Sequence, residues 1–279
     1  MTTQTQAPPA RGTAAPATAP ARASRRPLAD SRLIVIATQL VLLVGFLSLW
    51  EAAARNRWVD PLFTSRPSAI WSALIDYLGS DQASTSIRAT ATAVLESFAI
   101  GSALGILVGL ILGSSPFLDR VISPFLVPLN AVPRIALAPL FVAWFGLTNL
   151  SKVVLGVSVV FFILVENARS AVKGVDRDQL TMARVVGLRG WRMLTKVVLP
   201  SAVPTIFAGL RLGITYAILG VIGSEMIAAK DGLGQDVVRY SSELHIDFVF
   251  AVLIVLVVLA TVTSWIFGLL ERRLLRWQR

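Results

Sequence analysis

Ionisable side chains inside apolar stretches are the first places in this sequence where chemistry could be done. Arg134 and Arg211 lie about 20 Å and 16 Å into their apolar runs if those runs are helical. Charges in hydrocarbon are costly, so they are functional candidates. Glu96, Glu166 and Glu225 lie closer to the ends of their runs, so their depth in the membrane differs from that of the arginines by about 10 Å or more. We therefore expect no carboxylate beside either arginine, and predict a solute pathway that favours anions.

A structural role is the alternative for these arginines. Pro128, Pro133 and Pro139 remove backbone donors and so free carbonyl groups that an arginine can hydrogen-bond. For the three glutamates, pairing between helices or reaching toward the membrane surface is the simpler interpretation.

The sequence lacks the residue sets that enzymes and metal sites need. It has no cysteine, which excludes disulfides, thiolate metal sites and cysteine nucleophiles. Its single histidine, His245, falls in a short loop and is assigned no role. No Gly-x-x-x-x-Gly-Lys-Ser/Thr phosphate loop, paired carboxylates or Ser/His/Asp set occurs. We predict that the chain is not an enzyme and has no cofactor and no metal site.

Residues 173–200 form the most patterned polar segment. Residues 176–179 are typical of a helix N-terminus, and Gly187 is typical of the left-handed residue that ends a helix. A second helix should run over 191–199 and stop at Pro200. The pattern predicts two short helices with an elbow. A hairpin that merely rests on the membrane surface explains the pattern equally well.

This loop resembles the EAA loop of binding-protein-dependent ABC importer permeases, in which Glu-Ala-Ala is followed by Gly and then by Ile-x-Leu-Pro at fixed spacing. The corresponding residues here are Thr181, Met182, Ala183, Gly187, Val197, Leu199 and Pro200. The resemblance implies that the loop, including Trp191, places a coupling helix in a groove of a separate ATPase subunit. Thr181 and Met182 depart from the motif, so any task of the family's Glu carboxylate is in doubt.

The resemblance extends over residues 64–272. Short motifs there are similar to the branch that moves sulfonates, taurine, nitrate or bicarbonate: Arg66-Pro67-Ser68, Ala136-Leu137-Ala138-Pro139-Leu140, Trp144-Phe145-Gly146, Leu199-Pro200-Ser201-Ala202-Val203-Pro204, Gly209-Leu210-Arg211 and Gly232-Leu233-Gly234. It implies a second permease subunit in a homodimer, ATPase subunits and an extracytoplasmic solute-binding protein, with a small anion as solute.

Six long apolar stretches must position these residues. The chain has 279 residues, of which 55% are hydrophobic, and a mean hydropathy of +0.71. A membrane-spanning helix needs about 20 apolar residues. The candidate stretches are 33–54, 89–113, 121–145, 152–172, 201–229 and 247–270. We predict an all-α, polytopic membrane protein with six transmembrane helices over residues 31–279, and the resemblance specifies a type I ABC importer permease.

Glycines and prolines refine this arrangement. Gly101, Gly105, Gly109 and Gly113 recur every fourth residue and predict a groove for close helix packing. The prolines of stretch 121–145 predict a bent helix, buried and near the pathway. The apolar pattern of residues 67–78 predicts a short amphipathic helix lying on the outer membrane surface.

The net charge of +10 and the pI of about 11.1 suggest nucleic acid as a partner, but membrane topology explains them better. With the N-terminus inside, 17 basic residues fall in cytoplasmic segments and 6 outside. We predict a bacterial inner-membrane protein with both termini and the loop 173–200 in the cytoplasm. Residues 1–30 are predicted to be a disordered tail. Ser24-Arg25-Arg26 before the first apolar stretch is also typical of a twin-arginine export signal, but that stretch is longer than a signal core, so we predict that it is retained as a membrane span.

Two other function classes compete with the importer permease. A self-sufficient secondary transporter or channel would need an internal repeat or a pair of broken helices, and no such pattern is visible. A membrane anchor for a peripheral complex would explain the loop 173–200, but neither the proline-interrupted stretch nor the arginines inside the membrane.

Overall fold

The structure, a computed structural model, describes residues 32–274, and this range contains helices but no strand. The predicted tail 1–30 lies outside it. The bounds are α1 (Arg32–Arg55), α2 (Pro61–Thr64), α3 (Pro67–Leu78), α4 (Asp81–Ser114), α5 (Pro116–Ala131), η2 (Arg134–Leu137), α6 (Ala138–Phe145), α7 (Asn149–Lys173), α8 (Arg177–Val185), α9 (Gly190–Met193), η3 (Leu194–Val198), α10 (Leu199–Ile227), α11 (Leu233–Ser242) and α12 (Ile246–Leu274).

Five helical runs in this range are long and apolar enough to cross a membrane. The pair formed by 116–131 and 134–145 makes a sixth if its two parts, bent by 81°, count as one broken span. The predicted all-α membrane fold is therefore confirmed, with the proline-rich stretch as the broken member.

The chain separates into two contact units, residues up to Leu49 and residues from Trp50 onward. In the first unit, the side chains of residues 34–49 are all exposed. This exposure suits a helix surrounded by lipid, because hydrocarbon solvates apolar side chains as well as protein does.

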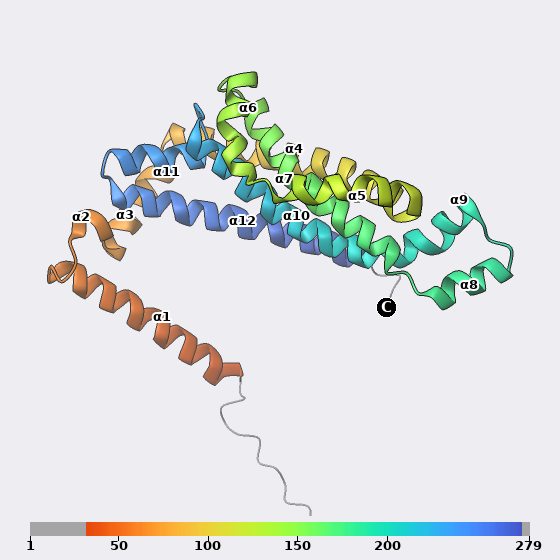
Figure 1. Cartoon of the computed structure of the whole chain (residues 1–279). Coiled ribbons are helices and arrows are strands. Elements are labelled where there is room, and N and C mark those ends of the chain that lie inside the picture. Colours follow the sequence, from red (N-terminus) through yellow and green to blue (C-terminus); the bar gives the residue numbers. More distant parts are fainter. Residues whose placement is uncertain (1–31, 275–279) are drawn as a thin grey trace, which may run out of the picture. The chain divides into compact units, whose positions relative to one another are not determined.

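The second unit is built around α4, α7 and α10. Their shared core contains Val94 of α4, Val160 and Leu164 of α7, and Ile214 and Val221 of α10. Figure 1 shows these helices running alongside one another, with the α8–α9 hairpin at one end and α3 and α11 at the other. We refer to these as the hairpin end and the α11 end.

A second core lies at the α11 end, where α3, α11 and α12 pack together. It contains Leu74 and Tyr77 of α3, Leu233 of α11 and Val252 of α12. The helix predicted over 67–78 is therefore present, but half of its apolar stripe packs on protein rather than on a membrane surface. The other half stays exposed, as the side chains of Trp71, Ile75 and Leu78 show.

The proline-rich stretch departs from expectation in its burial. We predicted a buried helix, but α5 has no buried residue. The helix ends at Ala131, and a 3₁₀ turn begins after Pro133. Because Phe125 and Val127 are exposed, α5 presents an apolar surface that the single chain does not cover.

The predicted stop at Pro200 is wrong. The helix that begins at Gly190 passes through one π turn, Leu194–Val198, and continues into α10 as a single 38-residue run. In this turn the amide of Leu199 bonds the carbonyl of Leu194, five residues back. The wider turn moves the preceding carbonyls away from the proline ring, so Pro200 is accommodated near the start of α10.

Candidate functional site

The loop 173–200 folds as a helical hairpin at one end of the unit. Asp176 caps α8 by accepting a hydrogen bond from the amide of Asp178 at 2.8 Å. Gly187, with φ of +83°, ends the helix. The amides of Gly187 and Leu188 bond the carbonyls of Arg184 and Ala183, at 3.0 and 2.9 Å. This pair of bonds is a Schellman motif, which requires a left-handed residue at the position of Gly187.

The tip of the hairpin exposes large apolar side chains. Met182 is 71% exposed, Val185 83%, Val186 75% and Trp191 74%. Thr181 stands where the motif has Glu, and its hydroxyl donates to the carbonyl of Arg177 at 2.9 Å. The surface of the tip is therefore apolar, and the position at which the motif has a Glu carries the hydroxyl of Thr181 instead.

The root of the hairpin is anchored, unlike its tip. Val172, Val175 and Val198 are buried together, and Leu180 and Leu194 pack against them. Of the predicted loop residues, Ala183 is also buried, while Val197, Leu199 and Pro200 lie in the π turn and the first turn of α10. The structure thus joins the hairpin firmly to α7 and α10.

Arg134 lies immediately after the break in the proline-rich stretch and is half-buried. It donates to the carbonyl of Leu129 at 3.1 Å and to Oδ1 of Asn130 at 3.2 Å. The carbonyl of Leu129 lacks its usual helical donor because Pro133 has no amide hydrogen. The guanidinium also lies 4.2 Å from the ring centroid of Phe162 on α7, a cation–π geometry.

Arg211 has a carboxylate partner, contrary to the expectation that neither arginine would have one. Its guanidinium forms an ion pair with Glu271 of α12. Sequence spacing concealed this pair, because Glu271 falls just beyond the last apolar stretch and becomes a neighbour only when α12 packs on α10. Arg134 forms no ion pair with a carboxylate in the described range.

The four regularly spaced glycines line the contact between α4 and α7. A Cβ added to Gly105 or Gly109 would lie 2.6 Å from the backbone oxygen of Phe161 or Val165. At Gly101 and Gly113 it would lie 2.8 and 2.7 Å from the Cβ of Val160 and Val172. The backbones therefore approach at a distance that excludes any side chain.

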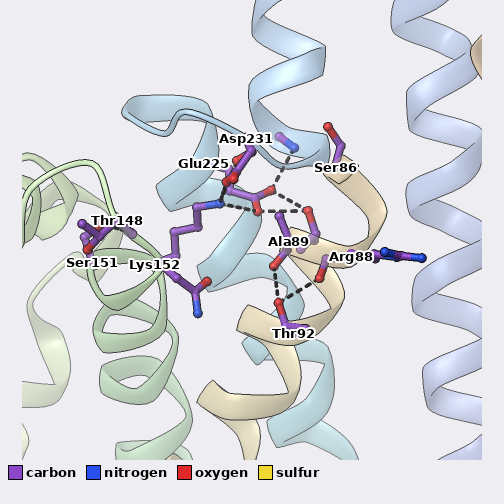
Figure 2. A network of polar contacts seen from close by, with 12 residues as sticks. Ser86, Arg88, Ala89, Thr92, Thr148, Ser151, Lys152, Glu225 and Asp231 are labelled. Carbon is purple, nitrogen blue, oxygen red and sulfur yellow. Dashed lines mark hydrogen bonds and ion pairs between the residues drawn. The ribbon is translucent and has the colours of Figure 1, made fainter. Parts of the chain in front are cut away.

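A buried polar cluster at the α11 end is the feature that sequence reasoning missed (Figure 2). Lys152 of α7 is 2% exposed and Glu225 of α10 is 0% exposed. The Lys152 ammonium lies 2.5 Å from Oδ1 of Asp231 and 3.5 Å from Oε1 of Glu225. Glu225 also accepts from Thr90 at 2.9 Å and from the amide of Gly234 at 3.0 Å. The sequence feature that could have revealed this cluster is the position of Lys152 and Glu225, each near the end of an apolar stretch.

A second carboxylate extends this polar framework to α3. Asp236, which is 1% exposed, accepts from the phenol of Tyr77 at 2.7 Å and from Gln82 at 3.0 Å. Burial and the adjacent Asp236 raise the pKa of Tyr77 above its ordinary value, so the phenol stays protonated and donates. The Gly232-Leu233-Gly234 motif thus lies between two buried carboxylates that fasten α11 to α3, α4, α7 and α10.

Comparison with known proteins places these features in a family. Residues 101–276 match the profile of the binding-protein-dependent transport system inner membrane component family. The putative aliphatic sulfonates transport permease protein SsuC of Bacillus subtilis is 33% identical over 181 residues, 65% of this chain and 66% of that protein. The taurine transport system permease protein TauC of Escherichia coli is 29% identical over 258 residues, 91% and 92% of the two chains.

Solved structures with the same fold come from other importers. An inward-facing methionine ABC transporter, MetNI, matches with a TM-score of 0.61 and 18% identity, covering 67% of this chain and 94% of that one. A bacterial ABC transporter involved in import of the polysaccharide alginate matches with a TM-score of 0.62 and 17% identity, covering 86% and 96%. This chain belongs to the binding-protein-dependent transport system inner membrane component family, the multi-pass permease subunits of ABC importers, which carry no ATPase domain.

Proposed function

We propose that this permease forms the solute pathway of an importer that consists of a permease homodimer, two ATPase subunits and an extracytoplasmic binding protein. The observation that carries the proposal is the α8–α9 hairpin, whose root is packed into the unit and whose apolar tip is uncovered. An uncovered apolar surface of this kind is typical of a protein-binding site. A known structure of a bacterial alginate ABC transporter in complex with an alginate-bound periplasmic protein supports the binding-protein part of this proposal.

The hairpin is the proposed docking element for the ATPase. Met182, Val185 and Trp191 would enter a groove of that subunit, while Gly187 sets the angle between α8 and α9. ATP binding closes the ATPase dimer and draws the two hairpins together, which opens the pathway outward. Hydrolysis resets the pathway inward. Both chain termini and the hairpin lie in the cytoplasm in this proposal, and residues 55–87 and 230–246 lie outside.

The proposed solute is a small organic or inorganic anion such as a sulfonate, taurine or nitrate. Relatives named for sulfonates and taurine, at about 30% identity, support this class. Within the pathway, Arg134 is the better candidate contact, because its charge is not neutralised by a described carboxylate. Arg211, paired with Glu271, is better suited to joining α10 and α12.

Uptake by the purified components in proteoliposomes tests this proposal. Radiolabelled taurine, ethanesulfonate and nitrate should be tested with the ATPase and the binding protein, with and without ATP. We expect ATP-dependent uptake of at least one anion that needs all the components. Uptake by the permease alone would favour a secondary transporter or channel, and ATP-dependent uptake of a cation but no anion would overturn the solute class.

Two glutamine variants then distinguish a pathway role from a structural role for Arg134 and Arg211. Arg134→Gln keeps hydrogen-bond donors but loses the charge, so a pathway role predicts normal assembly and basal ATPase with uptake reduced about tenfold. Arg211→Gln leaves Glu271 unpaired and should lower thermal stability instead. If Arg134→Gln transports normally, its role is limited to the carbonyl of Leu129 freed by Pro133.

A further inference from the structure

The hydrogen bonds and ion pairs that join α5 to α7 lie in the first two turns of α5. None of its residues is buried, and Phe117, Phe125 and Val127 are 65% to 70% exposed. Apolar packing within the single chain therefore does little to fix α5 against α7. Yet α5 leads directly into the 81° break that precedes Arg134, so its position helps to set where Arg134 lies, together with the contact of Arg134 with Phe162 of α7.

At the hairpin end, a cluster of charges connects α5 to α7. Asp119 of α5 accepts from Nε of Arg169 at 2.5 Å through one oxygen and from Nζ of Lys173 at 2.5 Å through the other. Arg169 also donates to the hydroxyl of Ser123, one turn further along α5, at 2.7 Å. Glu166 contacts the same guanidinium at 3.3 Å, but it belongs to α7 itself. We call Asp119, Arg169 and Lys173 the charge clamp.

The placement of the clamp strengthens it. Asp119 lies in the first turn of α5, where the helix dipole favours an anion, and Lys173 is the last residue of α7, where it favours a cation. The side chains of Asp119 and Arg169 are only 14% and 16% exposed. Partly buried ion pairs are screened less than surface ion pairs, which are individually weak.

The clamp is adjacent to the root of the hairpin. Lys173 precedes Gly174, and α8 begins at Arg177. Val172, next to Lys173, is buried with Val198 in the core that joins the hairpin to α7. A force applied to the hairpin therefore reaches the last turn of α7 directly, and the clamp is the polar link from that turn to α5.

We propose that Asp119, Arg169 and Lys173 are positioning residues that make α5 follow the hairpin during transport. The proposal rests on the proposed function, in which the ATPase moves the hairpin. With the clamp intact, a displacement of the hairpin also shifts α5. The 81° bend that follows α5 and Arg134 beside it then move as well. Without the clamp, the hairpin can still dock and the ATPase can still turn over, but α5 no longer moves with them.

The test is the number of solute molecules imported per ATP hydrolysed by the complete importer in proteoliposomes, with taurine or ethanesulfonate as the probe. Asp119→Asn keeps the shape of the side chain and removes its charge. We expect normal assembly and basal ATPase, and a coupling ratio that falls about fivefold or more, since a partly buried charge pair is broken. Glu166→Gln is the matched control, because it removes a carboxylate from the same arginine without affecting the link between helices. The coupling ratio of Glu166→Gln should stay within about twofold of the parent's ratio.

Two further variants keep the result decisive. Asp119→Glu retains the charge and should restore most of the coupling ratio. Lys173→Gln removes one side of the clamp at a residue that is 45% exposed, so it should assemble even if Asp119→Asn does not, with an intermediate loss. If both Asp119→Asn and Lys173→Gln couple as the parent does, or if Glu166→Gln is equally impaired, the clamp proposal is wrong. If the parent itself shows no ATP-dependent uptake, the proposed function fails instead.

Discussion

Gly187 is the residue on which the shape of the hairpin depends most directly. Its φ of +83° lies in the left-handed region, where a side chain costs about 1 kcal/mol. A Cβ at this position would meet no atom within 4 Å, so the cost is conformational rather than steric. We predict that Gly187→Ala assembles but shows reduced transport and reduced ATPase stimulation, and that Gly187→Val is worse because a β-branched residue suits this region least.

The control for Gly187 is Gly268→Ala in α12. Gly268 also has open space around its Cβ position but has an ordinary helical conformation. This variant should transport as the parent does in the same proteoliposome assay. Parent-like ATPase stimulation in Gly187→Ala and Gly187→Val would indicate that the hairpin is only a surface feature.

Glu225 is the residue whose loss should affect the α11 end most. Glu225→Gln would leave the buried ammonium of Lys152 with only Asp231 as a counter-charge. Leaving a buried charge without any partner costs about 3–5 kcal/mol, and the remaining pair with Asp231 should keep the loss below that range. We predict a clear fall in thermal unfolding temperature, measured in detergent. Glu243→Gln is the matched control, since its contact with His245 is exposed; an equal fall in both variants would contradict the prediction.

At the scale of elements, the glycine seam makes α4 and α7 a single packed pair. Gly105→Ala would place a methyl group 2.6 Å from a backbone oxygen of α7, and overpacking of this kind costs about 1–3 kcal/mol or more. We predict a lower yield of folded protein and a lower unfolding temperature. Gly45→Ala should be neutral, because its Cβ position is open. A parent-like melting temperature for Gly105→Ala would mean that the helices can separate at little cost.

The helices themselves were largely predictable, because apolar length and glycine spacing are local properties of the sequence. The π turn before Pro200 was not, since a proline after a short helix is equally typical of a helix stop and only the packing of Val198 against Val172 favours continuation. The exposure of α5 was also unpredictable. Prolines indicate a bend, but they do not indicate whether the bent helix is covered by its own chain or by a partner.

Pairings between distant helices account for the rest of what the sequence did not reveal. Arg211 and Glu271 are 60 residues apart, and Asp119 and Lys173 are 54 apart. Such pairs depend on which helices are neighbours and on their rotation about their own axes. The hairpin could be recognised because its signal, a capped helix followed by Gly187, is contained within a few consecutive residues.

At the scale of the whole molecule, basic side chains are unevenly distributed between the two ends of the helices. Arg120 and the arginines that end α12 lie at the hairpin end, as do the basic residues of the hairpin itself, whereas Lys173 there is paired with Asp119. At the α11 end, Lys152 is neutralised by Glu225 and Asp231, and Arg239 by Asp236. Net positive charge therefore gathers at the hairpin end, which the positive-inside rule assigns to the cytoplasm.

This asymmetry gives the final prediction, which concerns orientation in the membrane. Trp71 of α3 and Val185 of the hairpin are both exposed, at 65% and 83%, and the chain contains no cysteine that would interfere. In intact cells, a membrane-impermeant thiol reagent should label Trp71→Cys but not Val185→Cys. Permeabilised cells should label both, which controls for reactivity of each site. Labelling of Val185→Cys alone in intact cells would place the hairpin outside, out of reach of any cytoplasmic ATPase, and would overturn the docking proposal along with the orientation.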